Sequence, residues 1–414
     1  MTVTTAVLAG RLVDVVAGEV LADRAVLLDG DRVVDVVAAA EAPHDVEVLD
    51  LRDRWVLPGL IDCHAHLIGE LDEGHGYAGL LRTSTARETL AGSRNARDTV
   101  LAGFTTVRDV GTFRAFTDLA LRDAIAAGWV PGPRMVCAGA YITCPGGGGD
   151  LTGLSPEDDA LVPAGMRVGV VRSPAEVREA VKRIAGAGAD VIKVIATGAV
   201  LTTGTLPGEI ELGPAELEAA VDEAAAHGLH VSAHAHGAEG IKIAVRAGVR
   251  SIEHGSLMDD EAIALMAEHG TWLVADIYNG DYIKETGERD GWAEETLRKN
   301  EETTQTQRDG FRKAVAAGVK IAYGTDSGVY PWADAARQLP YMVRHGMAPM
   351  QAVQAATVRA AECLDRDAEV GSLRPGRYAD LVALDVDPLA DDLRGFASIP
   401  FVMKGGDVVK DDVV

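Results

Sequence analysis

Residues 230–255 read HVSAHAHGAEGIKIAVRAGVRSIEHG. The stretch opens and closes with short strand-like runs, at 230–234 and 251–254, and an Ala-rich amphipathic stretch separates them. A strand, a helix and a second strand in this order predict a parallel β-α-β unit, because parallel strands need a long crossover that is usually helical.

The same alternation continues along the middle of the chain. Each strand candidate is followed by a helical stretch, and the eight candidates lie at 56–66, 105–109, 134–138, 191–195, 230–234, 251–254, 271–275 and 321–326. Eight such alternations predict an α/β protein with a (β/α)8 TIM-like barrel. An open doubly wound sheet is the alternative, but no Gly-rich dinucleotide fingerprint follows the first strand.

The two ends of the chain have a different texture, in which short apolar runs are broken by Gly and Asp. Such segments are typical of antiparallel hairpins. We therefore predict a small β-sandwich domain assembled from both chain ends, residues 1–57 and 366–414. The barrel would occupy residues 58–365.

Composition disfavours several classes of protein. The formal net charge of -24 repels phosphate backbones and anionic lipid. The four cysteines show no CxxC spacing, no signal peptide is evident, and no apolar run is long enough to span a bilayer. We expect a cytoplasmic homo-oligomer that acts on a small molecule and binds neither nucleic acid nor membranes.

Polar residues stand where the predicted strands end, which is where barrel enzymes carry their chemistry. The first strand closes with His64-Ala65-His66. Strand side chains alternate between faces, so His64 and His66 point the same way and can share one metal ion. The structural alternative is a pair of hydrogen-bonded histidines.

Lys193 lies inside the apolar run Val191–Ile195. A charged group in a buried strand is costly unless it is paired or neutralised, and burial lowers the pKa of a lysine. The neutral amine can add carbon dioxide to form a carbamate, an anion that can bridge two cations. A lysine paired with a buried carboxylate is the structural alternative.

Three more candidates close later strands: His234, His254 and Asp326. His236 competes with His234 as a ligand because the two share a face, and we favour His234, with His236 as a group that supports the site or contacts substrate. Asp326 could instead be a helix N-cap. Taken in order along the strands, these residues supply enough ligands for two metal ions.

At this point the chain resembles the amidohydrolase superfamily, on His64-Ala65-His66, Lys193, His234, His254, Asp326 and the end-assembled β domain. Further stretches are similar to the branch of Xaa-Pro dipeptidases, arginine carboxypeptidase-like enzymes and imidazolonepropionase-related proteins: 189–193, 233–237, 248–255, 324–331 and 346–352. The resemblance implies two zinc ions bridged by carboxylated Lys193. His64, His66 and Asp326 would hold one ion, and His234 and His254 the other.

Two departures from that branch fall at the substrate end. Relatives often carry Gly-Gly-His after the third strand and Pro-His-Gly after the eighth, where this chain has Thr143–Asp150, without histidine, and Pro331-Trp332-Ala333. These differences weaken the assignment of any specific dipeptide. The ligands expected for the metals are intact.

The predicted chemistry is hydrolysis. Two cations would lower the pKa of a shared water, and Asp326 would take its proton and pass it to the leaving nitrogen. Lys193 would act as the bridge. The substrate-binding candidates at strand-end loops are His236, Tyr141, Tyr278, His75 and Arg167, and the stretch from Asp281 to Lys299 is expected to form an extra helical lid or else a solvated helix.

The preferred substrate is a small molecule with an amide bond, either a dipeptide of Xaa-Pro type or an N-acyl amino acid. Within the same architecture, the alternatives are ring opening of a cyclic amide, deamination, and hydrolysis of a lactone or phosphoester. Deamination is disfavoured by a bridging lysine. A non-catalytic metal-binding scaffold is the alternative from another class, and it would require a missing ligand.

Overall fold

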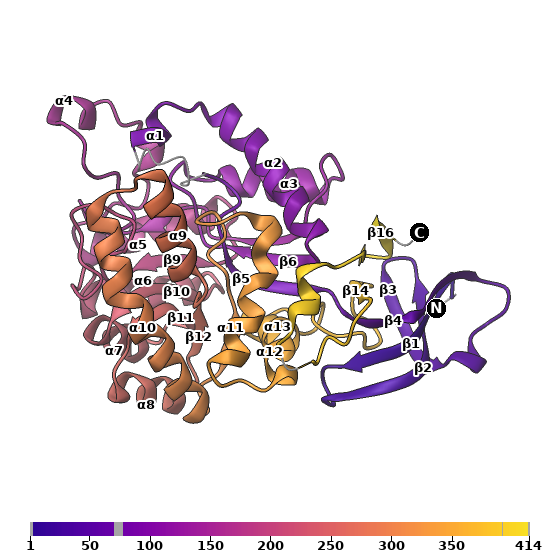
Figure 1. Ribbon diagram of the computed structural model, residues 1–414. Coiled ribbons are helices and arrows are strands. Elements are labelled where there is room, and N and C mark those ends of the chain that lie inside the picture. The colour runs from indigo at the N-terminus through magenta and orange to yellow at the C-terminus, as the bar shows by residue number, and fades with distance from the viewer. Residues whose placement is uncertain (1–2, 70–77, 391, 413–414) are drawn as a thin grey trace.

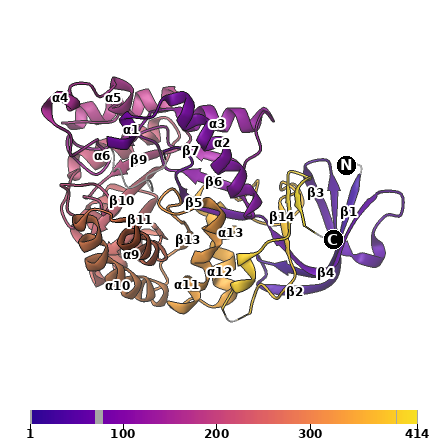
Figure 2. The same cartoon turned by 45° about the horizontal axis from the view of Figure 1, so that its top comes forward.

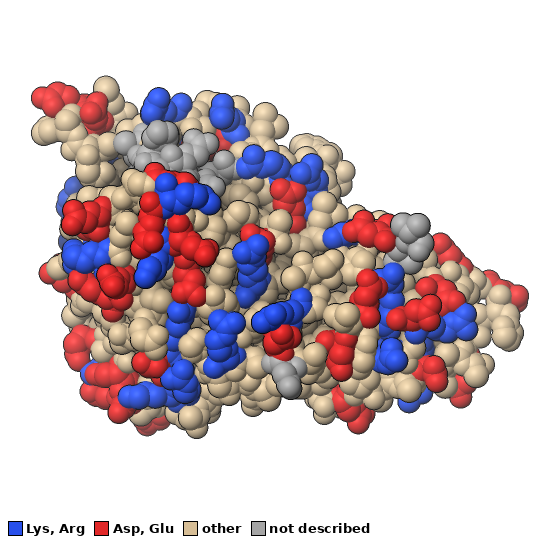
Figure 3. Space-filling model, viewed as in Figure 1, with Lys and Arg blue, Asp and Glu red and all other residues tan. Residues whose placement is uncertain are grey.

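The computed structural model describes residues 3–69, 78–390 and 392–412. Its strands form two parallel sheets inside a larger body and one mixed sheet at its side (Figure 1). Acidic and basic side chains are interspersed over the face seen in Figure 3.

The parallel strands are those that the β-α alternation predicts. Six form one sheet in the order β13-β12-β11-β10-β9-β8, and three form a second in the order β5-β6-β7. The bounds are β5 Leu60–Ala65, β6 Phe104–Asp109, β7 Arg134–Cys137, β8 Tyr141–Ile142, β9 Ile192–Ile195, β10 Val231–Gly237, β11 Ser251–Leu257, β12 Trp272–Ala275 and β13 Ile321–Tyr323. The short β8 is an addition to the eight predicted strands.

Backbone hydrogen bonds also join the two parallel sheets. After β13, the Asp326 amide donates to the His64 carbonyl over 2.7 Å, and the His66 amide donates to the Ser327 carbonyl over 2.8 Å. At the opposite side the Asp190 amide donates to the Cys137 carbonyl over 2.8 Å. The segment after β13 is thereby tied to the end of β5.

Helices surround these strands (Figure 2). The bounds are α1 Ala78–Leu81, α2 Thr85–Leu101, α3 Thr117–Ala126, α4 Pro156–Asp159, α5 Pro174–Gly186, α6 Pro214–Ala226, α7 Ala238–Ala247, α8 Asp260–His269, α9 Asn279–Asp290, α10 Glu294–Ala316, α11 Gln338–Arg344, α12 Pro349–Ala355 and α13 Val358–Cys363. Helix α5 illustrates why these segments form helices. Ser173 caps its first turn, Pro174 starts it, and its buried residues recur at helical spacing: Val177, Ala180, Val181 and Ile184.

The mixed sheet contains strands from both ends of the chain, in the order β16-β15-β14-β4-β1-β2-β3. The bounds are β1 Thr5–Asp14, β2 Glu19–Asp29, β3 Arg32–Ala38, β4 Glu47–Pro58, β14 Leu381–Leu384, β15 Phe401–Lys404 and β16 Asp407–Asp411. The sequence predicted a small β-sandwich. In the structure, hydrogen bonds connect all seven strands in one mixed sheet, because β4 pairs with β1 on one side and with β14 on the other. The domain limits at residues 57 and 366 stay a prediction.

Within the described residues, every helix is too short or too polar to cross a bilayer.

Candidate metal centre

One cavity lies at the carboxyl ends of the parallel strands. It encloses about 830 Å³, part of it open to solvent. All six predicted metal ligands line it: His64, His66, Lys193, His234, His254 and Asp326. Side chains that are up to 262 residues apart in the sequence therefore face one space, because parallel strands end at the same side of their sheet.

His64 and His66 follow the predicted strand alternation and meet Asp326. The Nε2 atoms of His64 and His66 lie 3.4 and 3.3 Å from Asp326 Oδ1. Each ring donates its other nitrogen, Nδ1, to an oxygen 2.9 Å away, on Glu253 for His64 and on the Gly111 carbonyl for His66. These bonds fix the tautomer that leaves both Nε2 atoms available to a metal ion.

Asp326 is ionised in this surrounding. Burial opposes ionisation, but the neighbouring imidazoles of His64 and His66 outweigh it and hold the pKa of Asp326 well below its usual range. Its carboxylate is thus in the form that binds a cation or accepts a proton.

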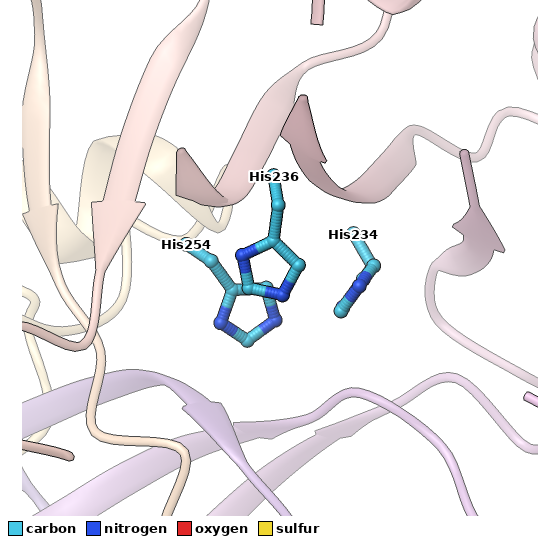
Figure 4. A group of neighbouring side chains, drawn as sticks. All are labelled: His234, His236 and His254. Carbon is cyan, nitrogen blue, oxygen red and sulfur yellow. The ribbon is translucent and has the colours of Figure 1, made fainter. Parts of the chain in front are cut away.

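His234, His236 and His254 form a second group (Figure 4). The ring centroid of His234 lies 4.6 Å from that of His236 and 4.5 Å from that of His254. His236 Nδ1 lies 2.7 Å from Ser256 Oγ, which leaves its Nε2 free for another partner. Burial lowers the pKa of His234 well below its ordinary value and that of His236 to about 3, so both rings are neutral donors of the kind that metals bind.

Lys193 is buried among these groups, with 2% of its surface exposed. Among the described residues its Nζ has no hydrogen-bond partner. Burial lowers the pKa of Lys193 to about 8, so the neutral amine is accessible near physiological pH. A buried side-chain nitrogen without a hydrogen-bond partner is rare in folded proteins.

The chain as a whole matches a known family. The model of the amidohydrolase family matches residues 55–409, most of the chain. The chain belongs to the amidohydrolase family. As a member with hydrolase relatives, it is an enzyme that hydrolyses amide-type carbon–nitrogen bonds.

Three relatives illustrate the breadth of the family around this amidohydrolase. The crystal structure of a Xaa-Pro dipeptidase with methionine bound in the active site is 35% identical, with a TM-score of 0.90 and coverage of 98% of this chain and 99% of that one. Ochratoxinase of Aspergillus niger is 33% identical over 389 residues, 90% of this chain and 78% of its own length. Imidazolonepropionase of Rhizorhabdus wittichii is 28% identical, with 90% of each chain covered.

The amidohydrolase site also contains a buried charged network that sequence reasoning missed. Glu253 lies directly before His254 on β11 and is fully buried. Its carboxylate accepts hydrogen bonds from His64 Nδ1 at 2.9 Å, Arg108 Nη2 at 2.7 Å and Ser232 Oγ at 2.7 Å. Burial alone would raise the pKa of Glu253, but Arg108 and His64 outweigh it and hold that pKa well below its usual range. The sequence signal that could have found this network is a charged residue inside an apolar strand-like run, as at Arg108 and Glu253.

Asp276 is a second missed residue. It follows β12 and lines the cavity, and its Oδ1 lies 3.1 Å from His254 Nδ1. With His254 and Asp326 it forms a third group of possible metal ligands. Gln307 Nε2 donates to Asp276 Oδ1 at 2.8 Å, and Asn279 Nδ2 spans Asp276 Oδ2 at 2.8 Å and Asp326 Oδ2 at 3.1 Å. The rule that polar residues follow strand ends could have found Asp276.

Two site residues have a left-handed backbone conformation, which residues other than glycine rarely adopt. The φ angle is +67° at His254 and +56° at Asp326. Each such residue costs on the order of 1–3 kcal/mol and persists where the surroundings enforce it, often at functional sites. The strain therefore falls on two residues of the predicted ligand set.

The substrate candidates separate into two groups. His236 and Tyr141 line the cavity, and the Tyr141 hydroxyl donates to the Gly111 carbonyl at 2.9 Å and lies 3.2 Å from His66 Nδ1. Tyr141 therefore stands beside the first metal-ligand group.

Two further substrate candidates, Arg167 and Tyr278, are not among the described residues that line this cavity. Arg167 was predicted to contact substrate, but its guanidinium forms ion pairs with Asp150 and Asp159 in a separate depression of the surface, so its charge is already neutralised. Tyr278 is buried against two other tyrosines and is not among the described residues that line the cavity. His75 lies outside the described residues.

Proposed function

We propose that this amidohydrolase uses two divalent metal ions, most simply zinc, to hydrolyse the amide bond of a dipeptide of Xaa-Pro type or an N-acyl amino acid. The observation that carries the proposal is the convergence of two histidine-rich donor groups on a buried lysine that has no partner among the described residues.

The residues present fit such ions. One group of possible ligands consists of His64, His66 and Asp326, and a second contains His234 and His254, with His236 beside them. Within each group the donor atoms lie within 4.8 Å of one another, and imidazole and carboxylate are the ligands that zinc prefers outside thiolate sites. Carboxylation of Lys193 would give its nitrogen a role and supply the anion between the two ions.

We propose His234, not His236, as the metal ligand on β10, as the sequence favours. Both lie on one face of β10, as alternation predicts, and both belong to the group around His254. We retain His234 as the ligand beside His254 and assign His236 to substrate contact, supported by its bond to Ser256 and its position on the cavity wall.

A closed (β/α)8 barrel belongs to the same proposal. Its support is the set of backbone hydrogen bonds that join the two parallel sheets beside His64 and Asp326. Closure of the strands would hold ligands from the first and last strands at a fixed separation. A cytoplasmic location and a homo-oligomeric state stay predictions from composition.

The chain's own residues can carry the proton transfers. When bound, the ions would polarise the scissile carbonyl and lower the pKa of a water. Asp326 would accept a proton at its carboxylate and return it to the leaving nitrogen. Asn279 would hold Asp326 through the bond to Oδ2, so that Oδ1 stays toward His64 and His66.

The choice of substrate draws on the relatives and on the cavity. The cavity lining includes apolar side chains, Phe113, Ile195, Val200 and Leu201, and polar uncharged ones, Asn300, Thr303, Thr304 and Gln307. A small molecule with an apolar substituent on an amide fits such a mixed lining. The imidazolonepropionase relative favours a cyclic amide as the second candidate.

The test combines metal analysis with a substrate screen. The zinc-reconstituted enzyme should contain about two zinc ions per chain and hydrolyse members of a panel of Xaa-Pro dipeptides, N-acyl amino acids, ochratoxin and small lactams. Lys193→Ala should lose most of the metal and the activity, whereas Lys320→Ala, at an exposed lysine, should keep both. Unchanged metal content in Lys193→Ala would refute the bridging role, and no activity on the panel would refute the substrate assignment.

A further inference from the structure

Helix α10 forms one wall of the cavity with a polar face. Asn300, Thr303, Thr304 and Gln307 recur at helical spacing and line the cavity. Lys299 lies beside this face and is buried, with 1% of its surface exposed. A buried lysine near a substrate cavity needs partners, and its partners lie on a neighbouring loop.

The Lys299 side chain binds the loop that follows β9. Its Nζ donates to the Thr202 carbonyl at 2.8 Å and the Ala199 carbonyl at 3.4 Å, and it pairs with Glu295 Oε1 at 2.6 Å. Glu295 Oε1 also accepts the Gly204 amide at 2.9 Å. The first turns of α10 therefore hold both sides of one turn of this loop.

The held turn contributes directly to the cavity. Residues 199–201, which we call the loop wall, all line it. The turn is compact, because Thr205 Oγ1 donates to the carbonyls of Ala199 and Thr202 and accepts the Ala199 amide. A shift of Lys299 would therefore move the wall as a unit.

The loop wall is also joined to the glycine segment on its other side. Thr202 Oγ1 donates to the Gly148 carbonyl at 2.8 Å, and the Gly148 amide donates to Glu211. Gly148 and Gly149 line the cavity next to the loop wall. One lysine on α10 thus fixes a continuous surface that faces the metal-ligand groups.

We propose that Lys299 is a specificity-determining positioning residue. It sets the distance of the loop wall from the metal-ligand groups, and thereby the size of the amide substituent that the cavity accepts. The inference rests on the proposed amide hydrolysis and adds which side chain sets the substrate size. Lys299 itself is not among the described residues that line the cavity, so it acts through the loop.

Methionine is the informative replacement. It keeps the length and much of the volume of the lysine side chain, but it removes the lysine's hydrogen bonds to the Ala199 and Thr202 carbonyls and its ion pair with Glu295. Arginine retains donors at this position. Lys242→Met is the matched control, because Lys242 is also buried and binds Glu239, Asp259 and Glu261, and it does not line the cavity.

The experiment compares the zinc-loaded wild type, Lys299→Met, Lys299→Arg and Lys242→Met. Two substrate series are used, one with acetyl, butanoyl and hexanoyl groups on a fixed amino acid, and one with amino acids of increasing size under a fixed acyl group. Hydrogen–deuterium exchange of residues 198–205 and metal content are measured beside kcat and KM.

In Lys299→Met, one of the two series should show a KM that rises about tenfold or more for its larger members, with little change for the smallest member and in kcat. Exchange in residues 198–205 should be faster, and metal content unchanged. Lys299→Arg should restore both in part, and Lys242→Met should lose stability without these changes.

A loss that is equal for all sizes, or unchanged exchange in residues 198–205, would overturn the inference. A wild type that binds two metal ions and cleaves no amide would refute the proposed function. In that case the exchange measurement alone decides whether Lys299 holds the loop wall.

Discussion

Asp326 concentrates several constraints in one residue. Its backbone is left-handed, its Oδ1 faces His64 and His66, and its Oδ2 accepts the Asn279 amide. Asn279 thus holds the side chain with Oδ1 toward the two histidines before any substrate enters. Such fixation suits a group that must accept a proton at a defined point.

We expect Asp326→Asn to fold but to lose turnover, with kcat lowered roughly 10²–10⁴-fold, because the amide cannot accept the proton. Activity, zinc content and the melting temperature are the measurements. Wild-type turnover in this variant would contradict the proton-transfer role. Asp281→Asn is the control, since Asp281 binds Arg308 and Tyr341 and is not among the described residues that line the cavity.

At the scale of the strands, Glu253 connects four of them. It lies on β11 and binds His64 of β5, Arg108 of β6 and Ser232 of β10. Because its charge offsets Arg108 in a buried place, the network orients a predicted ligand and holds the strands together at the same time.

Glu253→Gln should therefore lower the free energy of unfolding by about 3–5 kcal/mol, since Arg108 keeps a buried charge without its counterion. Zinc affinity should fall about 10–100-fold, because His64 loses the carboxylate that orients it. Ser232→Ala removes one hydrogen bond of the same carboxylate and should cost only about 1 kcal/mol. Chemical denaturation and zinc titration test both, and equal effects of the two variants would argue against the charged network.

The carboxylate of Glu211, in the loop that follows β9, binds the glycine segment at Gly148. Both oxygens of Glu211 lie within 2.9 Å of the Gly148 amide, and burial raises the pKa of Glu211 to about 7. A carboxyl group whose pKa is raised in the folded state favours folding at low pH. That contribution is complete below the ordinary pKa of 4.5 and is lost as the pH rises through about 7.

Glu211→Gln should remove this pH dependence while keeping an oxygen for the Gly148 amide. Between pH 4.5 and 7 the wild type should lose stability relative to the variant by on the order of 1 kcal/mol, a figure reduced for the partial exposure of Glu211. Denaturation midpoints at several pH values provide the measurement. Parallel curves for wild type and variant would show that Glu211 does not titrate in this range.

The whole molecule carries a formal net charge of -24, from 63 acidic and 39 basic residues. On the face shown in Figure 3, basic side chains lie among the acidic ones, so attraction between neighbouring opposite charges accompanies the net negative charge. At low ionic strength the excess repels itself over a Debye length of about 30 Å, which salt shortens to about 8 Å at physiological strength.

We expect the melting temperature to rise by about 1–3 °C when sodium chloride is raised from low to physiological concentration at pH 7. The rise should vanish near pH 5, where the net charge approaches zero because the pI is about 4.8. A salt effect of equal size at both pH values would point to a cause other than net charge.

Local patterns in the sequence predicted an α/β fold and a set of candidate metal ligands. Periodicity identified the strands that became β5 to β13 apart from the short β8, and the polar residues at their ends identified His64, His66, Lys193, His234, His254 and Asp326, which line one cavity. Both signals are local. Alternation along a strand and the cost of a buried charge act within a few residues.

Packing between elements brings further polar residues to the cavity that carry no such local signal. Asn300, Thr303 and Gln307 on α10 were not among the predicted site residues, yet they are buried and line the cavity. Arg167 was predicted to contact substrate, whereas its guanidinium forms ion pairs with two carboxylates, Asp150 and Asp159. A side chain's role there depends on partners distant in sequence, since burial and pairing are set by packing between elements and not by the chain's own period.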